Sequence, residues 1–264
     1  MTHFTAPVRN YMTAPAVTLP ADLDLNDALD VMMKHGITSA PVVETSGLLA
    51  GILSRTDLLR VGRVTRNHAL ETPLLFLPKA PVRLSMKSEV VTTTLDAEVG
   101  SAARDMLKHR IHRVVVTEGG APVGVLSVRD LARVIVDKRL SVPISSAMSS
   151  PVFTFPARET LSVATDRLEK AHVTGLVVID EEGWPIGIFS QRDALESREL
   201  PASTPVEEAM SHAMICLPHS MSLHRAAAQI IQMRVRRVLA IDARKVVGIL
   251  SGLDLARIVA NRTH

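Results

Sequence analysis

The chain contains the stretch Gly51-Ile-Leu-Ser-Arg-Thr-Asp57: a glycine, two apolar residues, a serine, two variable residues and an aspartate. The same pattern returns as Gly124-Val-Leu-Ser-Val-Arg-Asp130, Gly187-Ile-Phe-Ser-Gln-Arg-Asp193 and Gly248-Ile-Leu-Ser-Gly-Leu-Asp254. One copy would say little, because Ser-x-x-Asp is a common capping arrangement at the start of a helix. Several copies at a regular spacing predict an array of one supersecondary unit.

Fixed distances from a methionine connect the copies. The methionines that precede them are Met12, Met86, Met148 and Met210. An apolar residue follows 13 positions later at Leu25, Val99, Leu161 and Leu223, and a β-branched residue 25 positions later at Ile37, Ile111, Val173 and Val235. Successive methionines are 74, 62 and 62 positions apart, so the first linker is longer than the others.

The periodicity changes within each repeat in a readable way. In the first copy an extended run over 16–19 precedes apolar residues at helical spacing, at 25, 28, 29, 32 and 33. Asp24 stands at the expected N-cap of that helix. Two apolar runs, 40–44 and 48–53, flank a Ser46-Gly47 turn, and a last helix starts at the Ser-x-x-Asp. Each unit therefore reads β-α-β-β-α, an α/β (α+β) fold whose copies should pack in pairs because one unit cannot cover its own sheet.

Composition excludes several classes of protein. The chain has 264 residues, with 47% hydrophobic, 22% charged and 3% aromatic residues and a formal charge of +3, which does not argue for nucleic-acid binding. The single cysteine, Cys216, excludes an intrachain disulfide, and we expect it to be a buried structural thiol. No apolar run approaches the roughly 18 to 20 residues of a membrane span, and the N-terminus does not read as a secretory signal. A cytoplasmic protein is expected.

The repeat resembles the cystathionine-β-synthase (CBS) domain in its leading Met-(Ser/Thr), its β-α-β-β-α unit and its closing Gly-h-h-(Ser/Thr)-x-x-Asp. The resemblance covers four repeats, at about 8–60, 82–138, 143–198 and 205–262. It implies two paired (Bateman) modules, 1–138 with a surface linker at 61–81 and 139–264, packed into a pseudo-symmetric disk. It also implies similarity to the gamma subunit of AMP-activated protein kinase and its prokaryotic relatives. Two positions depart from the pattern: Met86-Lys87 replaces Met-(Ser/Thr), and Cys216 stands where the others carry threonine.

The motif itself offers chemistry for a nucleotide. A helix that begins at the motif serine leaves its first N–H groups without intrahelical partners, at the positive end of the helix dipole, which makes an anion site. The aspartate can accept hydrogen bonds from a ribose diol, and Gly51 would let a planar base approach the backbone. The candidate residues are Ser54, Asp57, Ser127, Asp130, Ser190, Asp193, Ser251 and Asp254. The alternative is that Ser and Asp only cap the helix, which needs no ligand.

Basic residues indicate which ligand is expected. After the β-branched residue, the odd repeats carry Thr38-Ser39 and Thr174-Gly175, and the even repeats carry His112-Arg113 and Arg236-Arg237. The resemblance implies that His112 and Arg113 contact phosphate. Two adjacent cations at the start of a core strand are costly unless an anion compensates them, although they could be a solvated pair. Arginine suits bidentate phosphate recognition, which favours AMP, ADP or ATP over S-adenosylmethionine, with NAD left open.

The sequence therefore predicts a regulatory sensor of adenine nucleotides without catalysis, cofactor or metal, which signals to a partner protein of unknown identity. We expect a monomeric disk or a homodimer and no binding to nucleic acid or membrane. The main alternative is an interaction scaffold whose repeats keep the caps but have no ligand sites. No catalytic or metal-binding constellation is found in the sequence.

Overall fold

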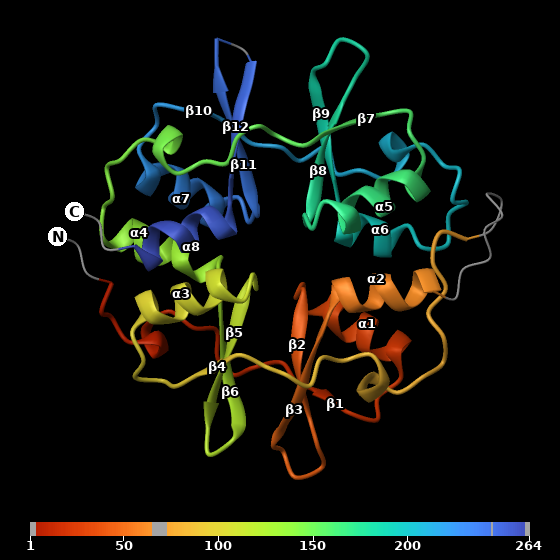
Figure 1. Cartoon of the computed structure of the whole chain (residues 1–264), viewed down its shortest axis with the longest axis vertical. Coiled ribbons are helices and arrows are strands. Elements are labelled where there is room, and N and C mark those ends of the chain that lie inside the picture. The colour runs from red at the N-terminus through yellow and green to blue at the C-terminus, as the bar shows by residue number, and fades with distance from the viewer. Residues whose placement is uncertain (1–3, 65–72, 244, 262–264) are drawn as a thin grey trace. The chain divides into compact units, whose positions relative to one another are not determined.

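The computed structural model describes residues 4–64, 73–243 and 245–261 (Figure 1). Repeat one contains β1 (Leu19–Pro20), α1 (Leu25–Lys34), β2 (Ser39–Val43), β3 (Leu49–Ser54) and α2 (Arg55–Val64). Repeat two contains β4 (Thr92–Thr93), α3 (Val99–Lys108), β5 (Arg113–Glu118), β6 (Ala121–Ser127) and α4 (Asp130–Asp137). Repeat three contains β7 (Thr154–Pro156), α5 (Leu161–Lys170), β8 (Gly175–Ile179), β9 (Pro185–Ser190) and α6 (Gln191–Glu196). Repeat four contains β10 (Cys216–Pro218), α7 (Leu223–Gln232), β11 (Arg237–Asp242), β12 (Lys245–Ser251) and α8 (Gly252–Ala260).

The β-α-β-β-α order predicted from the sequence is confirmed in all four repeats. In each three-stranded sheet the first strand runs parallel to the second, which forms an antiparallel hairpin with the third. The helix between the parallel strands buries the apolar stripe read from the sequence: in α1 the buried residues are Leu25, Ala28, Leu29 and Met32. The side chain of Asp24 accepts a hydrogen bond from the backbone N–H of Asn26 and so caps α1 as expected.

Short leading segments exchange between neighbouring repeats. They are residues 8–13, 82–87, 144–149 and 206–211, and each begins with a 3₁₀ turn: η1 (Val8–Asn10), η2 (Val82–Leu84), η3 (Ile144–Ser146) and η4 (Val206–Glu208). The residue after each methionine pairs with the last strand of another repeat, through the bridges Thr13↔Val125, Ile52↔Lys87, Ser149↔Ile249 and Ile188↔Ser211. The segment before repeat one thus completes repeat two, and the segment before repeat two completes repeat one. Repeats three and four exchange their segments in the same way.

This exchange explains the motif glycines. A Cβ at Gly51 would lie 2.6 Å from Sδ of Met86 and 2.7 Å from the carbonyl oxygen of Lys87. At Gly187 and Gly248 the corresponding distance to the methionine Sδ is 2.3 Å. The expectation that Gly51 leaves room for a base is therefore wrong, because the exchanged methionine fills that space. A side chain there would collide with the methionine, so glycine is needed for packing.

The chain divides into two compact units, and each combines an early repeat with a late one. Unit 1 consists of Met1–Ala16, Val90–Val152 and Ile215–His264 and holds repeats two and four; unit 2 consists of Val17–Glu89 and Phe153–Met214 and holds repeats one and three. Each unit has its own apolar core. Within unit 1 the helices α3, α4, α7 and α8 gather between its two sheets, as α1, α2, α5 and α6 do within unit 2 (Figure 1). The grouping into modules 1–138 and 139–264 stays a prediction.

The linker at 61–81 differs from the expected surface connection. Residues 61–64 belong to α2, and 65–72 lie outside the described residues. Leu74, Leu75 and Leu77 are buried in the core of unit 2, and the backbone N–H of Leu74 donates to the carbonyl of Leu200 at 2.8 Å. Burial of these apolar side chains places this part of the linker in the core of unit 2, the unit that contains repeat three.

Cys216 is exposed, so the expected buried thiol is wrong: in β10 the side chains alternate, and Leu217 faces the core instead. Among the described helices, none combines the length and the hydropathy needed to cross a membrane.

Candidate functional site

The four Ser-x-x-Asp motifs share one local geometry at the junction of a strand and a helix. In repeat one, both the backbone N–H and the hydroxyl of Ser54 donate to Oδ2 of Asp57, at 2.9 and 2.5 Å. The matching distances are 2.8 and 2.7 Å in repeat two, 2.7 and 2.6 Å in repeat three, and 2.7 and 2.6 Å in repeat four. The carboxylate thus closes the capping arrangement predicted from the sequence, and both lone pairs of Oδ2 are used.

The other carboxylate oxygen, Oδ1, differs between repeats. In repeat four, Oδ1 of Asp254 accepts from the Ser149 hydroxyl at 2.7 Å and lies 3.0 Å from Nη2 of Arg257. Oδ1 of Asp130 lies 3.4 Å from the Arg133 guanidinium. Oδ1 of Asp57 is buried and has no hydrogen-bond donor among the described residues. The repeats therefore offer a ligand different numbers of open acceptor positions.

Of the two motif aspartates in the second half of the chain, Asp193 has the more open carboxylate. It is partly exposed, and within the described part of the chain its Oδ1 receives no hydrogen bond. Burial raises the pKa of Asp193, while the hydrogen bonds from Ser190 oppose that change. This carboxylate keeps unused acceptor capacity in a partly desolvated position, where a hydrogen bond is stronger than in water.

The strand-start residues lie beside the motif serines. Arg113 pairs with Ser127 and Arg237 pairs with Ser251 across the hairpins of the even repeats. In three repeats the carbonyl of the residue just before the strand accepts a hydrogen bond from the residue that follows the motif serine: His112 accepts from Val128 N–H at 2.9 Å. Thr38 accepts from Arg55 N–H at 3.0 Å, and Thr174 from Gln191 N–H at 3.4 Å. All four predicted pairs therefore sit next to the helix start that they were expected to serve.

Unit 1 brings the two basic pairs together. His112 is mostly buried, and its pKa falls from 6.5 to about 4 because of burial and because of the positive charges of Arg113, Arg237 and Arg236. Two of those arginines belong to repeat four, 124 positions and more along the chain from His112. Arg237 is itself only 9% exposed. The predicted phosphate-binding residues of repeats two and four thus form one group, which we call the basic cluster: His112, Arg113, Arg236 and Arg237.

The two repeats of unit 1 meet at the residues that follow the motif serines. A Cβ at Gly252 would lie 2.3 Å from Cγ2 of Val128, so these two positions are in direct contact. Gly252 starts α8, and Val128 lies between β6 and α4. The basic cluster flanks this apolar contact, because His112 and Arg113 adjoin Val128 and Ser127.

Unit 2 has a different set of groups at the equivalent positions. Arg55 and Gln191 follow its motif serines, and the Gln191 amide donates to Oγ1 of Thr56 at 3.1 Å. Arg55 is 1% exposed, and its Nη2 lies 3.9 Å from Sδ of Met33. Sequence reasoning described the odd repeats as neutral from Thr38 and Thr174 and missed this buried cation. The signal was present in the sequence, since Arg55 follows a motif serine directly, but its burial depends on the fold.

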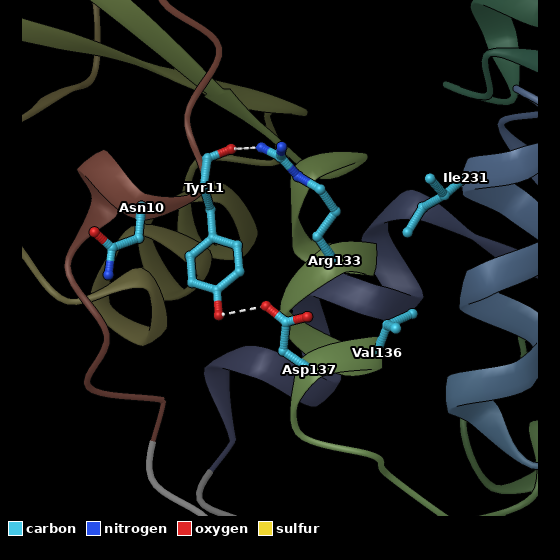
Figure 2. Close-up of a pocket in the computed structure, with 6 residues that line it drawn as sticks. All are labelled: Asn10, Tyr11, Arg133, Val136, Asp137 and Ile231. Carbon is cyan, nitrogen blue, oxygen red and sulfur yellow. Dashed lines mark hydrogen bonds between the residues drawn. The ribbon is translucent and has the colours of Figure 1, made fainter.

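A surface pocket in unit 1 was also missed (Figure 2). It encloses about 210 Å³ and is lined by Asn10, Tyr11, Arg133, Val136, Asp137 and Ile231. The Tyr11 hydroxyl donates to Oδ2 of Asp137 at 3.0 Å, and the Arg133 guanidinium donates to the carbonyl of Tyr11 (Figure 2). Burial and this hydrogen bond raise the pKa of Tyr11. No sequence pattern linked Tyr11 to Asp137, which lies 126 positions away.

The described residues contain no group of three or more histidine, cysteine or acidic side chains placed to hold a metal ion. The motif serines donate to aspartates and not to a histidine, so within the described chain they lack the paired base that activates a serine nucleophile. The arrangement can bind anions and hydroxyl groups.

Comparison with known proteins gives a consistent picture of the repeats. The family model of the CBS domain matches residues 8–63, 82–137, 144–199 and 206–261, close to the boundaries expected from the sequence. The matched segments include all four Ser-x-x-Asp motifs and all four strand-start pairs.

Relatives and solved structures cover different shares of the chain. The structure of protein MJ1225 from Methanocaldococcus jannaschii, described as a candidate archaeal homologue of the AMP-activated protein kinase gamma subunit, has a TM-score of 0.82 at 18% identity and covers 96% of this chain and 99% of that one. An uncharacterized protein from Pyrococcus horikoshii has a TM-score of 0.66 at 25% identity, over 96% and 99% of the two chains. A tRNA nucleotidyltransferase that adds A, from Aquifex aeolicus, is 28% identical over 128 residues, 48% of this chain and only 14% of that enzyme. The likeness to MJ1225 shows the four-repeat fold.

Proposed function

Because the chain belongs to the CBS-domain family, we propose that it is a non-catalytic regulatory sensor that binds an adenine nucleotide, AMP, ADP or ATP. The basic cluster would hold the phosphates, and motif aspartates would hold the ribose. Binding would change the packing of the repeats, and a partner protein would respond to that change. A ligand can cause such a change only if it binds the two packing states with different affinity.

The convergence of the basic cluster in unit 1 carries this proposal. Three guanidinium groups act on one buried imidazole, and one of them, Arg237, is itself nearly buried. Like charges that are gathered in a poorly solvated place repel one another, so an anion that reaches them lowers the free energy of the group. The N-terminus of α8 begins one residue after Ser251, opposite Arg237, and adds the positive end of a helix dipole.

A phosphate is the anion that fits this group best. Guanidinium groups bind phosphate oxygens through two parallel hydrogen bonds, and the pairs come from two repeats, so they can approach one phosphate group from different directions. In repeat two the motif serine, Ser127, sits across the hairpin from Arg113, and its aspartate, Asp130, keeps acceptor capacity for a ligand hydroxyl. A molecule with phosphate and a ribose diol a few ångströms apart would use both features, which is the reason for preferring a nucleotide to inorganic phosphate.

Calorimetric titration of the nucleotide-stripped protein tests the proposal. Wild type should bind AMP or ATP saturably. Arg237→Ala and Arg113→Ala should each lose about 1.5 to 3 kcal/mol for the nucleotide, because each removes a hydrogen bond to a charged group. Adenosine, which has no phosphate, is the matched ligand: its affinity should not change in either variant. Equal losses for adenosine would mean that the arginines support the fold and not the phosphate.

The scaffold alternative has one observation in its favour. In every repeat the motif serine already donates its proton to its own aspartate, so each motif is a satisfied cap without any ligand. Folded wild-type protein that takes up neither AMP nor ATP, nor NAD or S-adenosylmethionine, would establish this alternative. Binding of S-adenosylmethionine that is insensitive to Arg237→Ala would move the function to another adenosyl ligand.

A further inference from the structure

The leading segments place one residue beside the last strand of each repeat, and the four residues are not alike. The residue after the methionine is Thr13, Lys87, Ser149 or Ser211, and each pairs its backbone with the last strand of the repeat it completes. In repeat four the hydroxyl of Ser149 donates to Oδ1 of Asp254 at 2.7 Å. In repeat three the hydroxyl of Ser211 accepts from the N–H of Ala213 at 3.3 Å instead. Equivalent backbone positions thus give different side-chain contacts.

Counting hydrogen bonds shows what Ser149 does to Asp254. A carboxylate offers about four acceptor positions, two on each oxygen. Oδ2 of Asp254 accepts from the N–H and the hydroxyl of Ser251, and Oδ1 accepts from Ser149 and faces Arg257 at 3.0 Å. All four positions are taken, and Asp254 is only 1% exposed. A ligand hydroxyl has no open position at this carboxylate.

Asp193 is the contrast in the same half of the chain. Its Oδ2 is used by Ser190 in the same way, but Oδ1 receives no donor from the described residues, and the side chain is partly exposed. Two acceptor positions therefore remain, which lets both hydroxyls of a vicinal diol bind. The difference comes from the leading segment, because Ser211 is turned to its own backbone while Ser149 is turned to the aspartate.

We propose that Ser149 closes the motif of repeat four: its hydroxyl occupies the position that a ligand hydroxyl would need at Asp254, whereas the motif of repeat three stays open to a ligand diol at Asp193. This inference rests on the proposed function for the nature of the ligand. It makes Ser149 a residue that sets how many ligands the chain binds, although it lies in the segment before repeat three and the motif it closes belongs to repeat four.

Calorimetric titration with AMP of Ser149→Ala, Ser149→Thr and Ser211→Ala tests the closure. Ser149→Ala removes the hydroxyl and frees one acceptor position on Asp254, enough for one ligand hydroxyl, so this variant should bind a further equivalent of AMP, more weakly than the open site. Ser149→Thr keeps a hydroxyl and should match wild type. Ser211→Ala changes the equivalent serine that does not contact its aspartate, and should also match wild type. Unchanged stoichiometry in Ser149→Ala, or a gain in Ser149→Thr, would overturn the closure.

A second variant tests the open carboxylate. Asp193→Asn keeps an oxygen for Ser190 and replaces the free acceptor by a donor, so one class of AMP sites should weaken about tenfold or more. Full affinity in this variant would overturn the assignment to Asp193. Wild type that binds no AMP would refute the proposed function. If Ser149→Ala alone then gave a heat of AMP binding, the closure by Ser149 would still be supported. If neither protein bound AMP, the closure would be refuted as well.

Discussion

Unit 1 and unit 2 are built from the same repeat, yet they place charge differently around the start of the last helix. In unit 1 the positions after the motif serines are apolar, Val128 and Gly252, and the cations stand at the strand starts. In unit 2 the strand starts are neutral, and a cation, Arg55, occupies the helix start together with Gln191. One scaffold can therefore present positive charge from either of two adjacent positions, so the charge of a repeat cannot be judged from one of them.

The two units should therefore lose stability through different causes. Unit 1 depends on close packing between two small surfaces and on a neutral buried histidine; unit 2 depends on a polar contact between Gln191 and Thr56. Close packing fails through steric collision, a buried histidine through protonation, and a polar contact through the loss of one hydrogen bond. We expect these three kinds of disruption to change the free energy of unfolding by different amounts.

The largest effect is expected from the protonation of His112. The pKa of His112 is about 4 in the folded protein and 6.5 in the unfolded chain. Below pH 6.5 the unfolded chain therefore binds a proton that the folded chain does not. The contribution of His112 to the free energy of unfolding is therefore fully present above pH 6.5. It is lost as the pH falls toward 4, which lowers stability by about 3 kcal/mol. Urea unfolding of His112→Gln and wild type across that range should show the variant losing less stability on acidification. His109→Gln, at an exposed position three residues earlier, should keep the wild-type slope.

Nucleotide binding should also be coupled to the protonation of His112. A phosphate in the basic cluster would favour protonated His112, so nucleotide binding below pH 6.5 should take up a proton, detectable as a dependence of the binding heat on the buffer. Proton uptake that persists in His112→Gln would mean that another group is responsible.

The next effect is steric and belongs to unit 1. Gly252→Ala places a Cβ only 2.3 Å from Cγ2 of Val128, far closer than two carbon atoms can pack. Alanine at the start of a helix would otherwise be mildly favourable, but a β-branched neighbour moves little, so we expect a net loss of about 1 to 3 kcal/mol in the free energy of unfolding. The double variant Val128→Ala, Gly252→Ala should recover most of it. A single variant as stable as wild type would show that this contact has room to relax.

The fold was largely predictable from the sequence, and the site only in part. Offsets of 13 and 25 residues from each methionine located the helices and strands, and Gly-h-h-Ser-x-x-Asp located the last turn of each repeat. The same offsets could not show that Met86 packs on Gly51, because a fixed spacing holds whether a segment completes its own repeat or its neighbour. The contact of Ser149 with Asp254, 105 positions apart, and the convergence of His112 with Arg237 depend on how the repeats pack, which no local pattern encodes.

The smallest effect tests the polar contact of unit 2. Gln191→Ala removes the hydrogen bond from the Gln191 amide to Oγ1 of Thr56, at 3.1 Å, and should lower the free energy of unfolding by about 1 kcal/mol. Thr56→Val removes the other partner and keeps the shape of the side chain, so it should cost a similar amount, and the double variant should cost little more than either single one because both remove the same bond. Additive losses in this cycle would mean that the two side chains stabilise unit 2 separately, and that its repeats, unlike those of unit 1, are not held together by the residues that follow the motif serines.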